Sequence, residues 1–510
     1  MRLFPMNLGQ TRVRLVEAGA VFAAVALVAG CGSQYRPVVT PINPSGPSAQ
    51  PTAQAVVISA PSTSTPGVAT IIDYSGDTVM ATAPVGNGPT SFTLDGTGST
   101  GYTVNSDGTL TNFPASTNLQ AKNVTYTTLP TTSQLTGLFS PSTGLWAADL
   151  YGNVIDVLTG TPETYKLSIP VAPTPVFTVG YNLIGERNYS VSLNTTNAQA
   201  NNIPIIPYDV TCNTPSLFPT LTANKQVGEA DALEVSSYTV SQRIPLGVCP
   251  VYAVQTSDQR RTFILNRGSD TITVINSQAN TLDSCAPFTN QNGQTVTCHP
   301  TLPLSTAAVT ATGVTPPNGT AGMTAVAGPV YAEYNTLTSQ LVVANYDGST
   351  ISVIDVSLDE YGNDSSTFGT TFTIPVGNNP ASVTVLADGS RAYTANQSDQ
   401  TVTIVTLSSH TVEKTLPVIG HPRTVVSTAN SLYGKVYVAS PDSPYLTILR
   451  TDLDIVDTTV LVQGNIVDVR VTSSNGSSGN TNNVNRRPGA GQPCNLPGAV
   501  TTLTACQALP

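Results

Sequence analysis

Charged residues are scarce in this chain of 510 residues. Lys and Arg number 20 and Asp and Glu number 30, which is 10% of the chain, against roughly 25% in an average globular protein. The basic residues form no long run, and the formal net charge is −10. Nucleic-acid binding depends on clustered Lys and Arg that neutralise phosphates. The composition therefore excludes a nucleic-acid partner.

Histidine is nearly absent as well. No two of His299, His410 and His421 have the spacing of metal ligands, and the chain contains no Cys-x-x-Cys. It also lacks the Gly-x-Ser-x-Gly motif of serine hydrolases. We therefore expect no metal site and no cofactor, and the sequence identifies no catalytic residue. The single tryptophan, Trp146, is expected in the core.

The N-terminus has the layout of an export signal. Arg2, Arg12 and Arg14 precede the apolar run "AVFAAVALVAG". This run is shorter than the roughly 20 residues of a spanning helix. The run ends in Val28-Ala29-Gly30-Cys31, which resembles a bacterial lipobox. The resemblance implies a signal peptide over residues 1–30, lipid attachment at Cys31 and membrane contact through that anchor. The alternative is an ordinary signal peptide with a chance cysteine.

The residue after Cys31 is Gly32 rather than Asp, so the usual inner-membrane retention cue of such lipoproteins is missing. We expect a location in the bacterial cell envelope, at the outer membrane and facing the periplasm or the surface. Residues 31–53 are rich in Pro and Ser and are expected to form an extended tether.

Six further cysteines follow the export signal, an even number that favours disulfides. Fifteen connectivities are possible for six cysteines. Proximity in the sequence favours the pairs Cys285–Cys298 and Cys494–Cys506, which leaves Cys212 for Cys249. Residues 474–510 begin with "SSNGSSGNTNN" and are expected to form a flexible tail with a disulfide loop.

One phrase of sixteen residues occurs four times, at 261–276, 340–355, 391–406 and 435–450. Each copy has two runs of alternating apolar and polar residues, such as "QLVVAN" and "TISVID", around a short turn with Gly, Asp, Ser or Pro. This pattern predicts two half-buried strands in a β-hairpin. Weaker copies begin at Thr100, Gly144 and Arg187.

A second signature, Pro-x-x-x-x-Pro, separates these hairpins. It occurs at 84–89, 170–175, 245–250, 375–380 and 417–422, with a spacing of 42 residues between Pro375 and Pro417. Because proline is tolerated at strand edges, each marker is expected to close an outer strand, and another strand follows it. Four strands in about 42 residues predict an all-β fold, a β-propeller of four-stranded blades.

The stretches "KVYVAS", "QLVVANYDGSTISVID" and "FTIPVGNNPASVTVLADGSRAYTAN" resemble YVTN-type β-propeller repeats, found in bacterial surface and secreted proteins. The resemblance implies seven blades, whereas we count eight repeat units. We expect the propeller over residues 54–473. Its first blade has three strands before Pro84, and 467–473 is predicted to supply the fourth as its innermost strand.

Candidate binding residues lie in the turns, which the fold places at one end of the propeller. Asn266, Asn345 and Asn396 recur with Asp270, Asp347 and Asp399, and a ring of such side chains could bind a cation or a sugar. His421 and Arg423 lie in the turn "IGHP" and the residue after it. The alternative is that these residues recur because the turn recurs.

The sequence favours a binding or scaffolding module with a protein or glycan partner over an enzyme. The alternatives are a lactonase-like propeller hydrolase and a purely structural envelope component. One tryptophan cannot supply the repeated tryptophans of quinoprotein or sialidase-type propellers. Acidic and histidine side chains gathered in the channel would favour the enzyme, and an exposed aromatic patch would favour a binding partner.

Overall fold

A computed structural model describes residues 54–74, 76–95, 98–130, 135–139, 144–180, 187–194, 228–256, 258–290, 293–304, 327–428 and 434–472. All of them belong to the compact unit Ser45–Pro510. The predicted signal peptide, tether and tail lie outside these ranges, as do Cys31, Cys212, Cys494 and Cys506. Within these ranges no helix is long and apolar enough to cross a membrane.

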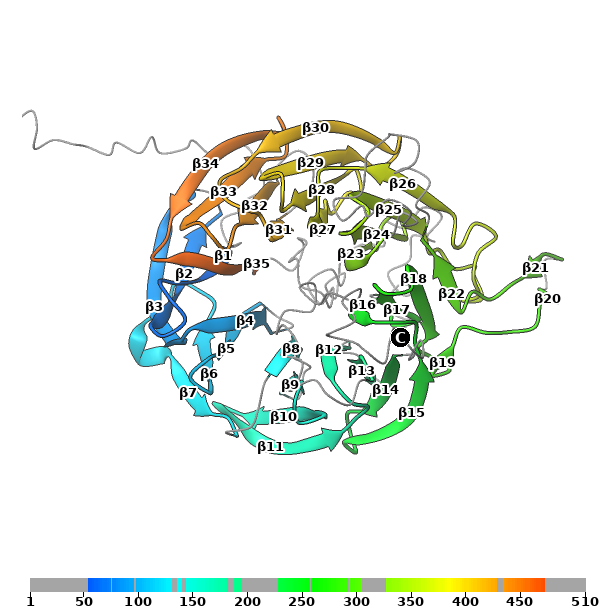
Figure 1. The fold of residues 1–510 in the computed structure, drawn as a ribbon, viewed down its shortest axis with the longest axis horizontal. Helices are drawn as coiled ribbons and strands as arrows, with labels where there is room; N and C mark the ends of the chain where they lie inside the picture. The colour runs from blue at the N-terminus through cyan, green and yellow to red at the C-terminus, as the bar shows by residue number, and fades with distance from the viewer. Residues whose placement is uncertain are drawn as a thin grey trace, which may run out of the picture. The chain divides into compact units, whose positions relative to one another are not determined.

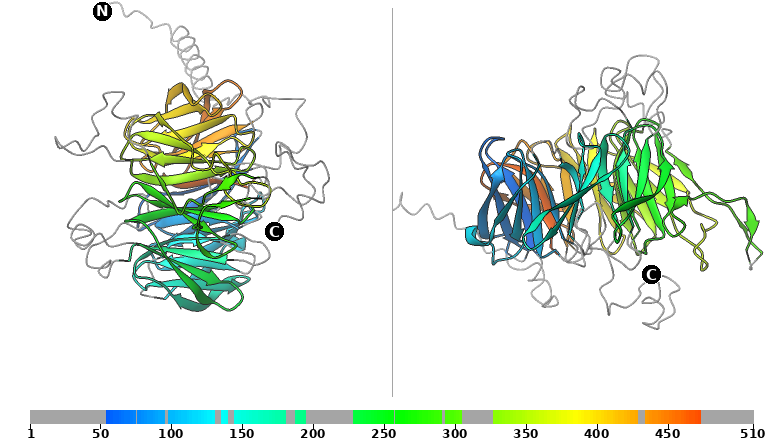
Figure 2. Two further views of the ribbon diagram at one scale, coloured as in Figure 1. Left: turned by 90° about the vertical axis from the view of Figure 1, so that its right-hand side faces the viewer. Right: turned by 90° about the horizontal axis from the view of Figure 1, so that it is seen from below.

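Eight antiparallel sheets stand around a common centre like the blades of a propeller (Figure 1). Each sheet runs from an innermost to an outermost strand, and the strands cross the ring from one face to the other (Figure 2). The all-β propeller and the count of eight are confirmed, and the seven-bladed alternative is wrong. A short 3-10 turn at Ala121–Asn123 precedes the last strand of the second blade.

We number the blades from the N-terminus and give their strands from the centre outward. Blade 1 contains β35 (Asn465–Val471), β1 (Gln54–Ala60), β2 (Pro66–Asp73) and β3 (Val79–Asn87); blade 2, β4 (Pro89–Leu94), β5 (Thr100–Asn105), β6 (Thr109–Pro114) and β7 (Thr125–Thr128); blade 3, β8 (Leu135–Phe139), β9 (Leu145–Asp149), β10 (Val154–Gly160) and β11 (Glu163–Pro170); and blade 4, β12 (Pro175–Val179), β13 (Arg187–Ser192), β14 (Glu229–Glu234) and β15 (Thr239–Pro245).

The second half of the ring follows the same order. Blade 5 contains β16 (Pro250–Gln255), β17 (Arg261–Asn266), β18 (Thr271–Asn276), β19 (Thr281–Leu282) and β22 (Thr301–Pro303); blade 6, β23 (Pro329–Asn335), β24 (Gln340–Asn345), β25 (Thr350–Asp355) and β26 (Thr371–Pro375); blade 7, β27 (Pro380–Val385), β28 (Arg391–Asn396), β29 (Thr401–Thr406) and β30 (Thr411–Pro417); and blade 8, β31 (Thr424–Ser427), β32 (Lys435–Ala439), β33 (Tyr445–Arg450) and β34 (Ile455–Leu461).

The four long repeats are the second and third strands of blades 5 to 8, with the predicted boundaries. The proline markers join the blades: Pro375 ends β26 and Pro380 begins β27. Because strands alternate in direction, these connections and the turns between second and third strands share one face of the ring. We call it the connection face.

The ring closes in blade 1. β35 pairs antiparallel with β1, from Ala55 opposite Val471 to Ala60 opposite Asn465, with a register shift between Ile58 and Ser59. The predicted closure is confirmed, and the strand begins two residues earlier than expected. Chain segments more than 400 residues apart in the sequence therefore complete one sheet.

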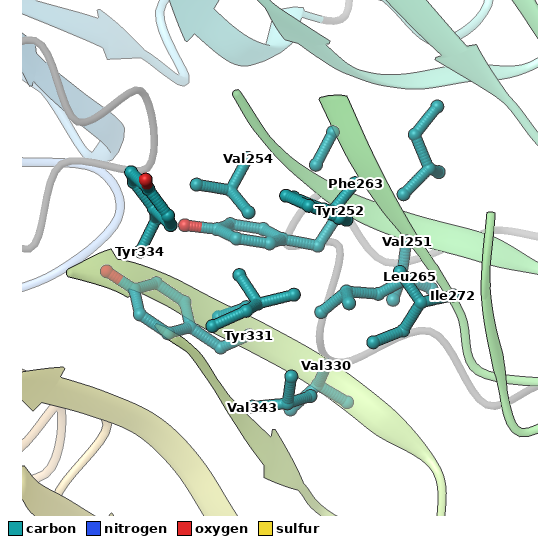
Figure 3. Packing of buried hydrophobic residues seen from close by; sticks show 14 of the residues in the cluster. Val251, Tyr252, Val254, Phe263, Leu265, Ile272, Val330, Tyr331, Tyr334 and Val343 are labelled. Atoms are coloured by element: carbon teal, nitrogen blue, oxygen red, sulfur yellow. The ribbon is translucent and has the colours of Figure 1, made fainter. Parts of the chain in front are cut away.

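The apolar core lies between neighbouring blades. Val251, Leu265 and Ile272 of blade 5 belong to the same buried cluster as Val330 and Val343 of blade 6 (Figure 3). Each fully buried side chain of this size contributes about 1.5–3 kcal/mol. Since neighbouring blades bury apolar side chains against each other, we expect a blade to be stable only between two others.

Polar contacts link the same neighbours at the face opposite the connections. A side chain from the second strand of one blade donates a hydrogen bond to a residue at the junction of the third and fourth strands of the next. The pairs are Tyr102 and Glu163 (2.7 Å), Tyr189 and Asn280 (3.1 Å), Arg261 and Asp364 (2.9 Å), Tyr393 and Asp454, and Lys435 and Asp77 (2.6 Å).

The outer strand of blade 5 is divided. β19 and β22 both pair with β18, and the chain between them leaves the ring as a projecting hairpin of β20 (Phe288–Thr289) and β21 (Thr295–Val296) (Figure 1). We call residues 284–300 the arm. The predicted disulfide Cys285–Cys298 is present at its base. Cys249 is also disulfide-bonded.

Ionic contacts hold both ends of the arm. Arg261 is within 3.3 Å of Asp283 and 2.9 Å of Asp364, and His299 Nδ1 lies 2.8 Å from the other oxygen of Asp364. The backbone N–H of His299 donates to Asp283. Burial raises the pKa of Asp283 to about 6 although Arg261 opposes the shift. The arm is therefore fixed to blades 5 and 6 at its base.

A chain that ends at Gly464 lacks β35 and is expected to lose cooperative unfolding or to aggregate through the exposed edge of β1. It would no longer bury Ile466, Val469 and Val471, which are almost inaccessible in the ring. At about 1.5–3 kcal/mol each, their loss is comparable with the stability of a whole domain. Thermal melts against a chain that ends at Thr472 measure the effect. Equal cooperative melting of both chains would show that the ring closes without β35.

Candidate functional site

The recurrent asparagines end the second strands of their blades and are fully buried. The side-chain amide of each donates to two hydroxyls on the third strand of its own blade, at 2.8–3.2 Å. The acceptors are Thr271 and Thr273 for Asn266, Thr350 and Ser352 for Asn345, and Thr401 and Thr403 for Asn396. Each asparagine thus fixes the hairpin that it precedes.

Glycine in the preceding connection makes room for this amide. A Cβ at Gly247 would lie 2.7 Å from Cγ of Asn266, and a Cβ at Gly377 would lie 2.7 Å from Cγ of Asn396. The asparagine is therefore enclosed between its hairpin and the connection to its blade. This accounts for its recurrence by turn chemistry. Ligand binding by Asn266, Asn345 and Asn396 stays a prediction.

The carboxylates of the same turns accept hydrogen bonds from other residues on the connection face. Asp347 accepts two hydrogen bonds from Arg267 of blade 5, at 2.9 and 2.8 Å. Asp270 accepts from the backbone of Gly328. Asp399 accepts from the backbone and side chain of Asn378. These turn carboxylates thus tie each hairpin to a neighbouring connection or turn.

His421 lies on the connection face and is about half exposed. Its Nδ1 is 2.6 Å from Asp442, and its backbone N–H donates to the same carboxylate at 2.8 Å. Partial burial opposes the shift, but the contacts with His421 lower the pKa of Asp442. His299 lies at the base of the arm, and His410 stacks on Phe372. Among the described residues no three His, Cys, Asp or Glu side chains gather to hold a metal ion.

Arg423, in contrast, lies near the central channel. It lies immediately before β31, the innermost strand of blade 8, and its charge acts on Asp468 of β35 in the adjoining blade 1. Asp468 and Arg470 form an ion pair of 2.8 Å. Burial raises the pKa of Asp468, and the two arginines oppose this shift.

Three aromatic side chains follow one another along the innermost strands of blades 4, 5 and 6. The ring centroids of Phe177 and Tyr252 are 5.0 Å apart, and those of Tyr252 and Tyr331 are 4.8 Å apart. The two tyrosines lie side by side, with their hydroxyls on the same side (Figure 3). Such tilted pairs are favourable contacts between aromatic rings.

The aromatic rings and the ion pair share one electrostatic environment. Burial raises the pKa of both Tyr252 and Tyr331, and Arg470 opposes the shift in each. Glu333, on the same strand as Tyr331, raises the pKa of that tyrosine further and accepts the backbone N–H of Val385 at 2.9 Å. We call Phe177, Tyr252, Tyr331, Glu333, Asp468 and Arg470 the channel cluster.

The channel cluster was not predicted from the sequence. A signal exists for its tyrosines, because β16 and β23 both begin with Pro-Val-Tyr-Ala and both tyrosines occupy the same register, opposite Leu265 and Ala344. Asp468 holds the corresponding place in β35, opposite Ile58. Aligning the innermost strands with one another would have shown these residues on one level of the channel.

Comparison with solved structures agrees with the fold. The apo structure of AztD from Citrobacter koseri is 12% identical, with a TM-score of 0.52, over 84% of this chain and 99% of that one. The dihydro-heme d1 dehydrogenase NirN, in complex with DHE, is 13% identical, with a TM-score of 0.51, over 86% of this chain and 78% of that one. No protein-family profile matches the sequence, and no curated protein matches it.

Asn345→Ala tests the role of the recurrent asparagines in holding the hairpin. The change deprives the hydroxyls of Thr350 and Ser352 of a buried donor, so we expect the free energy of unfolding to fall by about 1–3 kcal/mol. Asp399→Ala, in an exposed turn, is the control and should change stability by less than about 1 kcal/mol. Chemical denaturation measures both. An unchanged stability of Asn345→Ala would contradict the hairpin role.

Proposed function

We propose that this chain is a lipid-anchored, YVTN-type β-propeller of the bacterial cell envelope. It acts as a binding module and takes a sugar ring of a glycan partner in its central channel. The anchor and the location are supported by the ordered signal that ends in Cys31. The repeat type is supported by the stretches in blades 6 to 8. The channel cluster carries the proposal for the ligand.

The chemistry of the channel cluster suits a sugar. Phe177, Tyr252 and Tyr331 are 6%, 3% and 6% exposed, so only the parts of their rings that border the channel would contact the C–H face of a pyranose. Asp468 would offer a hydrogen-bond acceptor, and Arg470 donors, for the hydroxyls around the ring. A mainly aromatic wall with a few placed polar groups is the usual composition of a small-molecule site.

The lactonase-like alternative needs a group that activates water or a nucleophile. In the described part of the channel the titratable groups near the aromatic rings are Glu333, Asp468, Arg470 and Arg423, whereas His299 and His421 lie elsewhere. Carboxylates such as Glu333 and Asp468 can act as general bases, so hydrolysis stays the second candidate function. A ligand that is cleaved on binding would favour it over binding alone.

A binding assay tests the channel. Isothermal titration of the exported chain with neutral, amino and acidic sugars should find one class that binds. Tyr331→Ala should weaken that binding at least about tenfold, which corresponds to about 1.4 kcal/mol. Tyr331→Phe keeps the ring, and Tyr361→Ala removes an exposed tyrosine (49% accessible); both should bind nearly as tightly as the wild type. No sugar binding by the wild-type protein would refute the ligand assignment.

The anchor has an independent test. If Cys31 carries lipid, the wild-type protein sediments with membranes, and Cys31→Ser releases it into the soluble fraction. Subcellular fractionation with detection of the attached lipid by mass spectrometry measures this. A wild-type protein that is wholly soluble would contradict the anchored location and leave the channel assignment untouched.

A further inference from the structure

Four consecutive blades share an exposed apolar residue at the second position of the outermost strand. These residues are Phe372 in blade 6, Val412 in blade 7, Val456 in blade 8 and Met80 in blade 1. Each of them is 38–51% accessible. The four strands follow one another along the outer edge of the ring (Figure 1), so the exposed side chains form a row.

Blade 8 widens this row. Leu453, in the turn before β34, is 57% accessible, and Ile455 begins the strand and is exposed as well. We call Phe372, Val412, Leu453, Ile455, Val456 and Met80 the apolar rim. The corresponding part of blade 4 is different, because the exposed residues among the first five of β15 are Thr239, Ser241, Gln242 and Arg243. The outer edge of the ring is therefore apolar on one side and polar on another.

Contacts between blades hold the apolar rim together. His410, just before β30, stacks on Phe372 with 3.7 Å between the ring centroids. In β30 itself, the side chain of Lys414 donates to the carbonyl of Asp454, in the turn before β34, at 2.8 Å. The buried ion pair between blades 8 and 1 lies beside the turn before β3. The apolar side chains are thus parts of one continuous surface rather than scattered single residues.

The described chain begins at the same end of the ring. Gln54 begins β1, which is a second strand and runs toward the connection face, so Gln54 lies at the opposite face. We call this the exit face. Its backbone N–H donates to Oγ1 of Thr472 at 3.0 Å, and it lies opposite Asp73, just before the turn that leads to β3. The turns before β30 and β34 lie at the exit face too, because they also join third and fourth strands.

The preceding part of the sequence connects this end of the ring with Cys31. A chain as long as residues 31–53 spans about 25 Å on average when flexible and at most about 80 Å when fully extended. A lipid on Cys31 would therefore keep blade 1, and with it the apolar rim, near the bilayer at a high effective concentration. Arg450, close to the rim, is paired with Asp452 at 2.7 Å, so attraction to anionic lipid is not required.

We propose that the apolar rim rests on the bilayer surface, with blade 8 foremost, and that it turns the connection face of the ring away from the lipid. This orientation rests on the lipid anchor of the proposed function. Half-exposed aliphatic and aromatic side chains can enter the boundary between headgroups and acyl chains, and a fluid bilayer needs no shaped groove to receive them. The mouth of the channel on the connection face then stays open to a glycan partner.

Tryptophan fluorescence tests this contact, because the single native tryptophan, Trp146, is fully buried and gives a constant background. The lipid-anchored chain with Leu453→Trp, in phosphatidylcholine vesicles, should lose emission when lipids with brominated acyl chains replace ordinary ones. Leu461→Trp is the matched control, since Leu461 is 60% accessible and ends the same strand at the connection face; its emission should not change. Equal quenching of both variants, or of neither, would overturn the proposal.

A second measurement is independent of the anchor. The Cys31→Ser chain carries no lipid, so its sedimentation with phosphatidylcholine vesicles reports on the rim alone. We expect weak binding, which Leu453→Asp should reduce at least about tenfold and Leu461→Asp should leave unchanged. A Cys31→Ser chain that does not sediment at any lipid concentration would overturn the docking, whereas lipid detected on wild-type Cys31 would still support the anchor. Self-association that Leu453→Asp abolishes would assign the rim to a second copy of the chain and overturn the proposal as well.

Discussion

The pairing of β1 with β35 is the interaction on which the ring depends. Neighbouring blades bury apolar side chains against each other, and an open arc of eight blades would leave two blade faces in water. The antiparallel ladder from Ala55–Val471 to Ala60–Asn465 removes both at once. Hydrogen bonds outside the ladder support it, from Thr472 to Gln54 and from Ser59 to Gln463. The first and last strands must therefore meet before any blade reaches its full stability.

Closure of the ring does not by itself set the angle between neighbouring blades. The buried polar contacts at the blade junctions set this angle. Lys435 and Asp77 are both almost inaccessible and lie 2.6 Å apart. Such a pair adds little net stability compared with apolar residues, but it is satisfied in only one relative placement of blades 8 and 1. Tyr102 with Glu163 and Arg261 with Asp364 impose the same condition on other junctions. Interchangeable apolar faces thus acquire a defined alignment.

Much of the fold could be predicted because its information is local. Alternation over six residues, a turn and another six residues define a hairpin, and the proline markers set the period. The pair Cys285–Cys298 was predictable for the same reason, because a short separation favours it. The closing strand could be inferred because three strands before Pro84 leave a blade one strand short.

The channel cluster could not be predicted in the same way, because its residues come together only in the folded protein. Tyr252 and Tyr331 share the local pattern Pro-Val-Tyr-Ala, but Arg470 lies on a third blade and no local pattern connects it with them. For Asn266, Asn345 and Asn396 the sequence left two interpretations open, because a recurring amide in a turn looks the same in sequence whether it faces water or is covered by a glycine.

The arm of blade 5 has a consequence for how this protein can change. It leaves and re-enters the ring between two pieces of one outer strand, and Cys285 and Cys298 hold its ends with their Cα atoms 5.4 Å apart. The closing cost of a longer loop grows only slowly with its length, and the crosslink already fixes the span that the ring experiences. Residues between the two cysteines can therefore be lengthened, shortened or exchanged for an unrelated peptide while the blades keep their register. Among the described segments, the arm is therefore a suitable place to display a foreign epitope.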